Sequence, residues 1–257
     1  MPLVIAHRGN SSAAPENTFA SFESALAAGV TAVECDVQMT RDGELVVIHD
    51  QTLDRTSDRV GDVRQMTLAE VQAADVSCPA TFGSRFAPQR VPTLGELLAF
   101  VKGRCRLMLE IKRESSLADT DRFERRIAAE VVRSGLRFAP DTETEIAFLS
   151  FSTPVLERMA VILPEAPRGH LFYRDPEDAL FALAERAGAG FIMPEKGHLS
   201  ASLLARARER GLGVATWVCD DVAEFEQLST LGLLGIGTNR PAEMMAASKS
   251  GASKSGD

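Results

Sequence analysis

Short apolar runs alternate with amphipathic segments along most of this 257-residue chain. The first run, at 3–6, is followed by a segment at 18–28 whose apolar residues recur at helical spacing, and another apolar run follows at 32–37. Repeated strand–helix units require parallel strands joined by right-handed crossovers. The alternation therefore predicts an α/β protein built on a parallel sheet.

The alternation is interrupted once. A turn at 41–43 leads into another predicted strand at 45–48, and residues 51–92 are then mainly polar and contain several prolines. We interpret 51–92 as an insertion with one short helix near 68–74. Insertions of this length commonly shape or cover a binding site.

After the insertion the same rhythm returns. Strands are predicted at 107–111, 145–150, 168–172, 191–193, 214–218 and 234–237. Helices are predicted at 94–101, 122–134, 154–161, 176–187, 199–210, 222–230 and 241–247. About eight such units predict a TIM (β/α)8 barrel with a small insertion after its second strand. A doubly wound sheet is the alternative, although no GxGxxG motif follows a predicted strand.

The domain prediction is one barrel over 1–247, with the insertion inside it, and a disordered tail at 248–257 that is rich in Ser, Gly and Lys. A net charge of −8 disfavours nucleic acids and anionic membranes as partners. The first apolar run is too short for a signal peptide, and no stretch is long enough for a transmembrane segment. We therefore expect a cytoplasmic protein, while the oligomeric state stays open.

Catalytic groups of such barrels lie at the carboxyl ends of the strands. Ionisable side chains collect at those predicted ends, at His7, Arg8, Glu34, Asp36, His49, Glu110 and Lys112. Glu34 and Asp36 are two positions apart, so they point to the same side of their strand. Three carboxylates that converge with Glu110 would repel one another unless a cation is present. Hard oxygen ligands suit magnesium, calcium or manganese.

The remaining groups suit phosphate chemistry. His7 and His49 could transfer protons, because an unperturbed imidazole has a pKa of about 6.5. Arg8 and Lys112 could contact a phosphate. A purely structural interpretation also stands, in which Glu34 pairs with Arg8 and Glu110 with Lys112, and His7 is a strand-end residue.

Other polar and aromatic residues carry weaker signals. Asp50 and Arg55 lie in polar loop sequence, and we expect them to be solvated. Phe151 follows a predicted strand end and Trp217 lies near the end of strand seven. Either aromatic residue could line the mouth of a pocket or belong to the core.

Several short motifs follow one another along the chain: His7-Arg8-Gly9, Pro15-Glu16-Asn17-Thr18, Glu34-x-Asp36, Asp42-Gly43, His49-Asp50, Leu53-Asp54-Arg55-Thr56, Pro92-Thr93-Leu94, Glu110-Ile111-Lys112 and Thr238-Asn239-Arg240-Pro241. Taken together, these motifs resemble those of the glycerophosphodiester phosphodiesterase family. Any one triplet is a weak signal, but the combination spans nearly the whole chain and is highly specific.

The resemblance implies a TIM barrel with a small insertion, and hydrolysis of glycerophosphodiesters such as glycerophosphocholine to an alcohol and glycerol 3-phosphate. It implies that one divalent cation is bound by Glu34, Asp36 and Glu110. It further implies an acid–base pair, His7 and His49, and phosphate contacts from Arg8 and Lys112.

The chain departs from the family pattern at three places. Leu234 and Asn239 stand where the family often has aspartate, and Trp217-Val218-Cys219-Asp220 stands where it usually has Trp-Thr-Val-Asn. These departures leave the pocket wall and the preferred head group open. One alternative function is a lysophospholipase D, which would need an apolar groove near the mouth. Another is a non-catalytic metal- or phosphate-binding barrel, which would not need both histidines.

Overall fold

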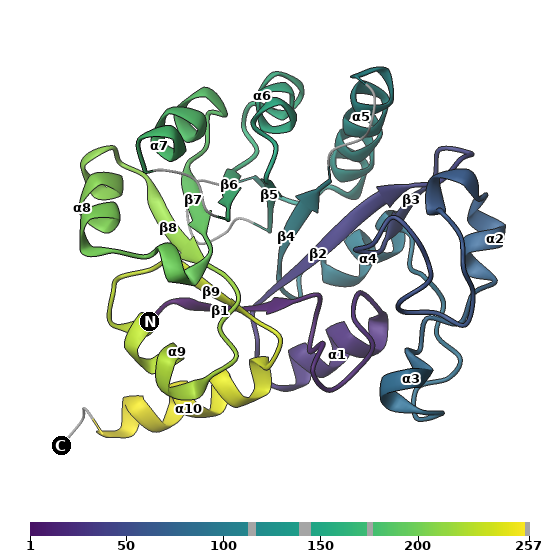
Figure 1. The fold of residues 1–257 in the computed structure, drawn as a ribbon, viewed down its shortest axis with the longest axis horizontal. Helices are drawn as coiled ribbons and strands as arrows, with labels where there is room; N and C mark the ends of the chain where they lie inside the picture. The colour runs from purple at the N-terminus through teal and green to yellow at the C-terminus, as the bar shows by residue number, and fades with distance from the viewer. Residues whose placement is uncertain (113–116, 139–144, 174–176, 255–257) are drawn as a thin grey trace.

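The computed structural model describes the whole chain except residues 113–116, 139–144, 174–176 and 255–257. Its parallel strands are β1 (Leu3–His7), β2 (Ala32–Met39), β4 (Arg106–Ile111), β5 (Ile146–Ser150), β6 (Arg168–Phe172), β7 (Phe191–Pro194), β8 (Gly213–Thr216) and β9 (Gly235–Thr238). Each strand pairs with the next, and β1 pairs with both β2 and β9, which closes the barrel (Figure 1). The predicted TIM barrel is confirmed, and the sheet is not the open one of the alternative.

Helices follow the strands and lie around the outside of the barrel (Figure 1). They are α1 (Phe19–Ala27), α4 (Leu94–Val101), α5 (Leu117–Ser134), α6 (Thr153–Ile162), α7 (Glu177–Arg186), α8 (Ala201–Glu209) and α9 (Val222–Ser229), with a short 3-10 helix, η2 (Lys196–His198), after β7. Their starts follow local capping chemistry. Thr18, for example, accepts a hydrogen bond from the Ser21 N–H and so begins α1.

The last helix, α10 (Pro241–Lys254), is longer than the predicted helix at 241–247. Residues 248–254 therefore continue this helix, where the sequence analysis predicted a disordered tail. The end of that tail, at 255–257, lies outside the described residues.

The insertion contains more regular structure than predicted. Before it, the strand predicted at 45–48 is present as β3 (Leu45–Val47), which pairs antiparallel with β2 on the outside of the barrel. Then come η1 (Val63–Gln65), α2 (Leu68–Gln72) and α3 (Pro79–Phe82), where only one helix was expected. A separate apolar cluster holds this part together, formed by Val46, Ile48, Leu53, Val63, Val71, Ala74, Val76 and Val91.

The apolar core has two layers. The inner layer fills the barrel with Ile5, Ala32, Ala147, Leu149, Leu171, Phe191, Met193 and Ala215. The larger outer layer lies between the strands and the surrounding helices. Full burial of one Leu, Ile or Phe side chain contributes about 1.5–3 kcal/mol. On β2, Glu34 and Asp36 share the inward face with Ala32, so the carboxylates continue the inner layer towards the carboxyl ends of the strands.

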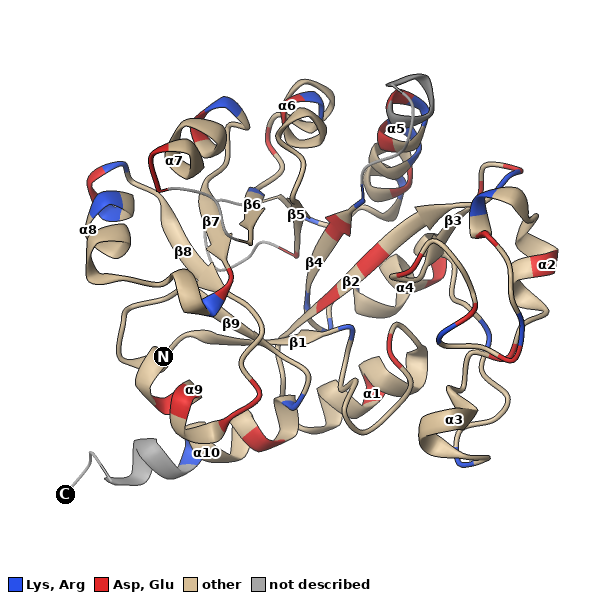
Figure 2. Cartoon of the chain, viewed as in Figure 1, with Lys and Arg blue, Asp and Glu red and all other residues tan. Residues whose placement is uncertain are grey.

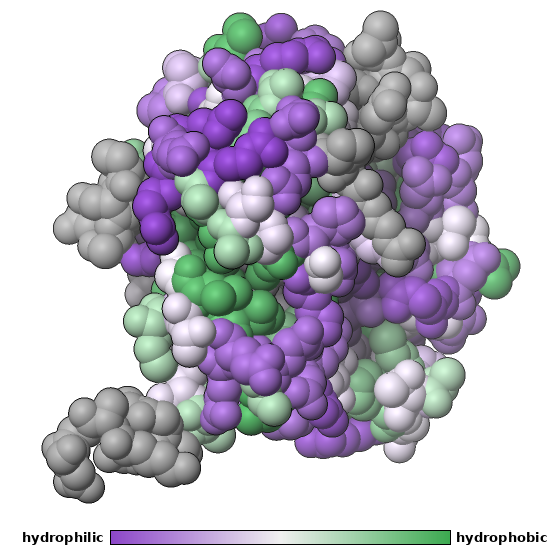
Figure 3. All heavy atoms as spheres, turned by 60° about the vertical axis from the view of Figure 1, so that its left-hand side comes forward, coloured by the Kyte–Doolittle hydropathy of each residue, from purple (hydrophilic) through white to green (hydrophobic). Residues whose placement is uncertain are grey.

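Most of the face drawn in Figure 3 is hydrophilic, and hydrophobic side chains gather in one area near its centre. Within the part of the chain that the structure describes, no helix is both long and apolar enough to cross a membrane. The cytoplasmic location stays a prediction.

Candidate active site

Three carboxylates meet inside the barrel near the carboxyl ends of neighbouring strands. Glu34 and Asp36 lie on β2, and Glu110 lies beside Asp36 in the pairing of β2 with β4. The acidic residues show as red bands on β2 and near the end of β4 in Figure 2. One oxygen atom from each carboxylate lies within 4.8 Å of the others, and all three residues are buried. The predicted convergence is therefore present.

Two cations compensate part of this charge. Lys112 Nζ lies 2.7 Å from Asp36 Oδ1 and 2.5 Å from Glu110 Oε1. Arg8 Nε lies 3.2 Å from Asp36 Oδ2, and Arg8 also pairs with Glu16. Burial alone would raise the pKa of Asp36, but the attraction of Lys112 and Arg8 outweighs it and lowers this pKa. Asp36 is thus an ionised, fully buried carboxylate.

Glu34 is less well compensated. Its Oε2 accepts the backbone N–H of Arg8 at 3.1 Å, so the side-chain pairing of Arg8 with Glu34 in the structural interpretation is not what forms. Its Oε1 is buried and has no hydrogen-bond partner among the residues described. Burial, followed by repulsion from Asp36 and Glu110, raises the pKa of Glu34 well above its usual value. Burial also raises the pKa of Glu110, against the attraction of Lys112.

The carboxylate set fits a bound cation. A buried oxygen without a partner, next to two further carboxylates, is the environment that a hard divalent cation completes. The same oxygen set suits magnesium, calcium and manganese alike.

His7 ends β1 and faces the carboxylates. Its Nε2 lies 3.9 Å from Glu34 Oε2, and its Nδ1 lies 2.7 Å from Asn239 Oδ1. Burial, and then the charge of Arg8, lowers the pKa of His7 to about 4. The ring is therefore neutral near pH 7 and can accept a proton.

His49 follows β3, and its ring is held by a neighbouring acidic residue. Its Nδ1 lies 2.6 Å from Asp50 Oδ1. Arg55 donates to Asp50 Oδ2 at 2.6 Å and to both carboxylate oxygens of Glu16 at 2.7 Å. Arg55 is exposed, as expected of a solvated residue, and Asp50 is half-buried, but both are also ion-paired: Asp50 holds the His49 ring and Arg55 holds Asp50. The sequence signals for this role were the adjacency of His49 and Asp50 and the place of Asp50 and Arg55 in two of the family motifs.

The loop after β1 needs unusual backbone angles. Arg8 has φ 58° and Gly9 has φ 83°, both in the left-handed region. A Cβ atom on Gly9 would lie 2.0 Å from Ser21 Oγ, so only glycine fits there. Asn17, also at positive φ, donates to Asp36 Oδ2 at 2.9 Å. Sequence reasoning did not assign Asn17 to the site, although it lies in one of the family motifs.

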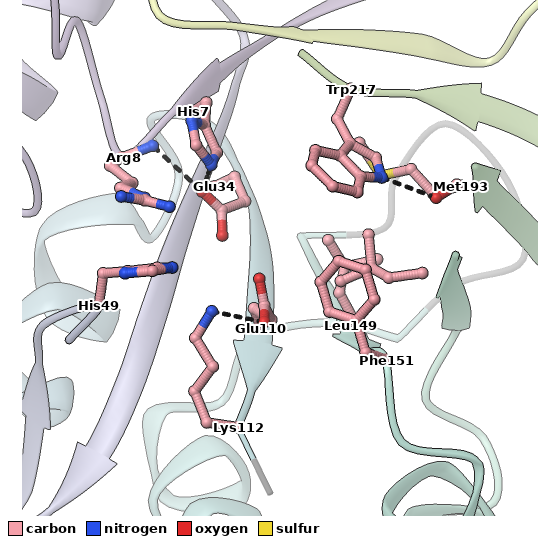
Figure 4. Close-up of a pocket in the computed structure, with 11 residues that line it drawn as sticks. His7, Arg8, Glu34, His49, Glu110, Lys112, Leu149, Phe151, Met193 and Trp217 are labelled. Atoms are coloured by element: carbon pink, nitrogen blue, oxygen red, sulfur yellow. Dashed lines mark hydrogen bonds and ion pairs between the residues drawn. The ribbon is translucent and has the colours of Figure 1, made fainter. Parts of the chain in front are cut away.

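These groups line one pocket of about 220 Å³. Its lining residues are His7, Arg8, Glu34, His49, Glu110, Lys112, Leu149, Phe151, Leu171, Met193 and Trp217. Figure 4 shows the ionisable side chains on one side of the pocket and the apolar ones on the other. Phe151 and Trp217 meet edge to face, with ring centroids 5.5 Å apart. Both aromatic residues therefore line the pocket. Asp36 is buried and is not among the lining residues, but it contacts Arg8 and Lys112, which are.

The sequence profile of the glycerophosphoryl diester phosphodiesterase family matches residues 7–243. This chain belongs to that family. The match begins at His7 and includes every residue that the sequence analysis placed in the site.

Individual proteins are also similar to this chain in sequence and in fold. A glycerophosphodiester phosphodiesterase of Caldanaerobacter subterraneus subsp. tengcongensis is 31% identical over 93% of this chain and 94% of that protein. The crystal structure of a glycerophosphodiester phosphodiesterase from Agrobacterium tumefaciens superposes with a TM-score of 0.81 at 28% identity, over 96% of this chain and 100% of that one. An Oleispira antarctica phosphodiesterase, solved in complex with the product sn-glycerol-3-phosphate, gives a TM-score of 0.83 at 26% identity over 97% of both chains.

Proposed function

We propose that this protein hydrolyses glycerophosphodiesters to an alcohol and glycerol 3-phosphate, with one divalent cation and a histidine acid–base pair. The observation that carries the proposal is the pocket itself. It brings two imidazoles and two cationic side chains against three buried carboxylates. The product named in the Oleispira antarctica structure supports the substrate class.

Glu34, Asp36 and Glu110 would hold the cation. When bound, a magnesium, calcium or manganese ion would supply Lewis-acid polarisation of the phosphodiester. Without the cation, burial and then repulsion from Asp36 and Glu110 raise the pKa of Glu34.

Side chains of the protein would supply proton transfer and charge stabilisation. One histidine, His7 or His49, takes the proton of the nucleophile, which is either the glycerol 2-hydroxyl or a water molecule. The other histidine donates a proton to the oxygen of the leaving alcohol. Attack by water gives glycerol 3-phosphate directly, whereas attack by the 2-hydroxyl gives a cyclic phosphate that a water molecule must then open to glycerol 3-phosphate. Arg8 and Lys112 stabilise the charge that develops on the phosphoryl oxygens. The adjacent Asp50 keeps the His49 ring oriented through Nδ1.

The test is release of glycerol 3-phosphate from glycerophosphocholine and glycerophosphoethanolamine, after chelation and after addition of each cation. His7→Ala and His49→Ala should each lower turnover by about 10²–10⁴-fold. His198→Ala, on η2 and not among the pocket residues, is the matched control. Near-normal turnover in both pocket variants would overturn the acid–base assignment. Absence of product with every cation would favour the non-catalytic barrel instead.

The apolar half of the pocket supports a second candidate, a lysophospholipase D. Leu149, Phe151 and Leu171 form part of a wall that could take an acyl chain, as could Met193 and Trp217. Rates on glycerophosphocholine and lysophosphatidylcholine would separate the two functions. Faster cleavage of the lipid, lost on Phe151→Ala, would favour the second.

A further inference from the structure

Asn239 lies between His7 and Asp220, an acidic residue that is not among the pocket residues. Its Oδ1 is 2.7 Å from His7 Nδ1. Its Nδ2 donates to Asp220 Oδ2 at 2.8 Å, and its backbone N–H donates to Asp220 Oδ1 at 2.7 Å. The pairing of β9 with β1 places Asn239 beside His7, because Thr238 is the partner of Ala6.

Asp220 determines which way the Asn239 carboxamide points. A third donor, the hydroxyl of Thr238, reaches Asp220 Oδ1 at 3.0 Å. A carboxylate only accepts hydrogen bonds, so the NH2 group of Asn239 must face Asp220 and the carbonyl must face His7. The orientation of the Asn239 carboxamide thus follows from the hydrogen-bonding chemistry of Asp220.

This orientation selects one tautomer of His7. The carbonyl oxygen of Asn239 accepts hydrogen bonds, so the proton of the neutral ring must sit on Nδ1. Ser11 Oγ lies 3.0 Å from the same oxygen and 2.9 Å from the carbonyl oxygen of His7. Both of these oxygens accept hydrogen bonds from the single hydroxyl proton of Ser11. The contact with Ser11 is therefore compatible with the Asn239 carbonyl, and not its NH2 group, facing His7. Nε2 is then left unprotonated on the side of Glu34.

We propose that Asp220 is a positioning residue for His7, acting through the Asn239 carboxamide to keep the ring as the Nδ1–H tautomer with Nε2 facing the pocket. The inference rests on the proposed role of His7 in proton transfer. In either role, as base or as acid, His7 would then exchange its proton with the substrate at Nε2, while Nδ1 keeps its own proton. The carboxylate of Asp220 acts one amide away, so His7 gains orientation without a directly bonded negative charge.

The tautomer can be read directly. The chain contains four histidines, so long-range nitrogen–proton correlation spectra of protein with labelled histidine rings are tractable. The His7 signal is assigned as the one missing in His7→Gln. At pH 7.5 we expect the Nδ1–H pattern in the unmodified protein.

In Asp220→Asn the carboxamide of Asn239 is free to turn over and offer its NH2 group to His7. We expect a shift of His7 towards the Nε2–H pattern and a fall in kcat of about 10–100-fold, with KM little changed. Asp221→Asn is the matched control. It makes the same chemical change at the neighbouring position, where the side chain caps α9, and should alter neither readout.

The reciprocal exchange keeps the proposal falsifiable if one variant folds poorly. Asn239→Asp alone places two carboxylates together and should lose activity. The double variant Asp220→Asn, Asn239→Asp again offers an acceptor to His7 Nδ1 and a donor between the two side chains. It should recover the Nδ1–H pattern and most of the turnover.

Two results are decisive. An Nδ1–H pattern that persists in Asp220→Asn, or a double variant no better than either single one, overturns the positioning role. A changed tautomer with unchanged kcat supports the positioning of His7 but refutes the proposed use of His7 in the reaction.

Discussion

Lys112 Nζ lies 2.7 Å from Oδ1 of Asp36, a carboxylate whose side chain has 0% exposed surface. The pair lies where the proposed cation ligands meet, and Glu110 shares the same ammonium group. Burying either charge alone would be costly, so each makes the other tolerable. The site is therefore held together by the same charges that its proposed chemistry requires.

Lys112→Met should destabilise the metal-free protein by about 3 kcal/mol, because it leaves buried carboxylates short of a cation. Urea unfolding in the presence of a chelator measures this difference. With a saturating divalent cation, the difference in unfolding free energy between Lys112→Met and the unmodified protein should become smaller, since the ion replaces part of the lost positive charge. Lys249→Met, at an exposed position, is the control. Equal stability of Lys112→Met and the unmodified protein in chelator would contradict the prediction.

Glu34→Gln should have the opposite effect on stability. The glutamine can still accept the Arg8 N–H, but it removes a charge that is disfavoured first by burial and then by repulsion from Asp36 and Glu110, the two causes that raise the pKa of Glu34. We expect the metal-free variant to gain about 0.5–2 kcal/mol, while added cation stabilises it less than it stabilises the unmodified protein. For comparison, a ligand at 100 times its Kd contributes about 2.7 kcal/mol. A thermal-shift series with magnesium, calcium and manganese tests both parts, and an unchanged cation response would rule out Glu34 as a ligand.

Phe151→Ala should affect substrates according to their alcohol group. Its edge-to-face contact with Trp217 and its place on the apolar wall favour a methylated or aliphatic head group. We expect KM for glycerophosphocholine to rise about 3–10-fold, which corresponds to about 0.7–1.4 kcal/mol, and KM for glycerophosphoglycerol to change less.

A matched control for Phe151→Ala exists in the insertion. Phe82 and Phe86 form another edge-to-face pair, with ring centroids 5.4 Å apart, and neither is among the pocket residues. Phe82→Ala should leave both KM values unchanged. Equal KM changes for the two substrates in Phe151→Ala would mean that the aromatic wall does not read the head group.

The barrel and the ionisable residues of its mouth were predictable because both follow from periodicity. The alternation of apolar runs determines the parallel strands, and the two-residue period of a strand places Glu34 and Asp36 on one face. The convergence with Glu110 then follows from neighbouring parallel strands, as the register of β2 with β4 shows.

The sequence analysis missed features that leave no repeating pattern of apolar residues in the sequence. Helix α3 has four residues and begins at Pro79, too short for any apolar repeat to appear. Arg55 supports His49 through Asp50 and is itself held by Glu16, which lies 39 positions earlier in the chain. The contact of His7 with Asn239 spans 232 positions and depends on barrel closure. Such pairings become visible only when the strands are assembled.

A last prediction concerns acid stability at the start of α4. Thr93 caps this helix, and Glu96 accepts from the Thr93 N–H at 2.9 Å while Arg90 donates to its carboxylate. The Arg90 hydrogen bonds, and then those of Thr93, lower the pKa of Glu96 to about 2 against the effect of burial. Because the unfolded pKa is about 4.3, this contribution is complete above that pH and is lost as the pH falls towards 2.

Glu96→Gln should remove that pH dependence while keeping the capping geometry, because glutamine also serves at this position. With 37% of the Glu96 side chain exposed, the loss at pH 7 should stay below about 1 kcal/mol. The difference from the unmodified protein should shrink between about pH 4.3 and pH 2, since both side chains are then uncharged. Urea midpoints at pH 7, 4 and 3 measure it. The stability difference between Arg90→Met and the unmodified protein should shrink over the same pH range, and Arg90→Met should add little to Glu96→Gln in the double variant. A stability difference for Glu96→Gln that stays constant with pH would mean that the ionised Glu96 carboxylate contributes nothing.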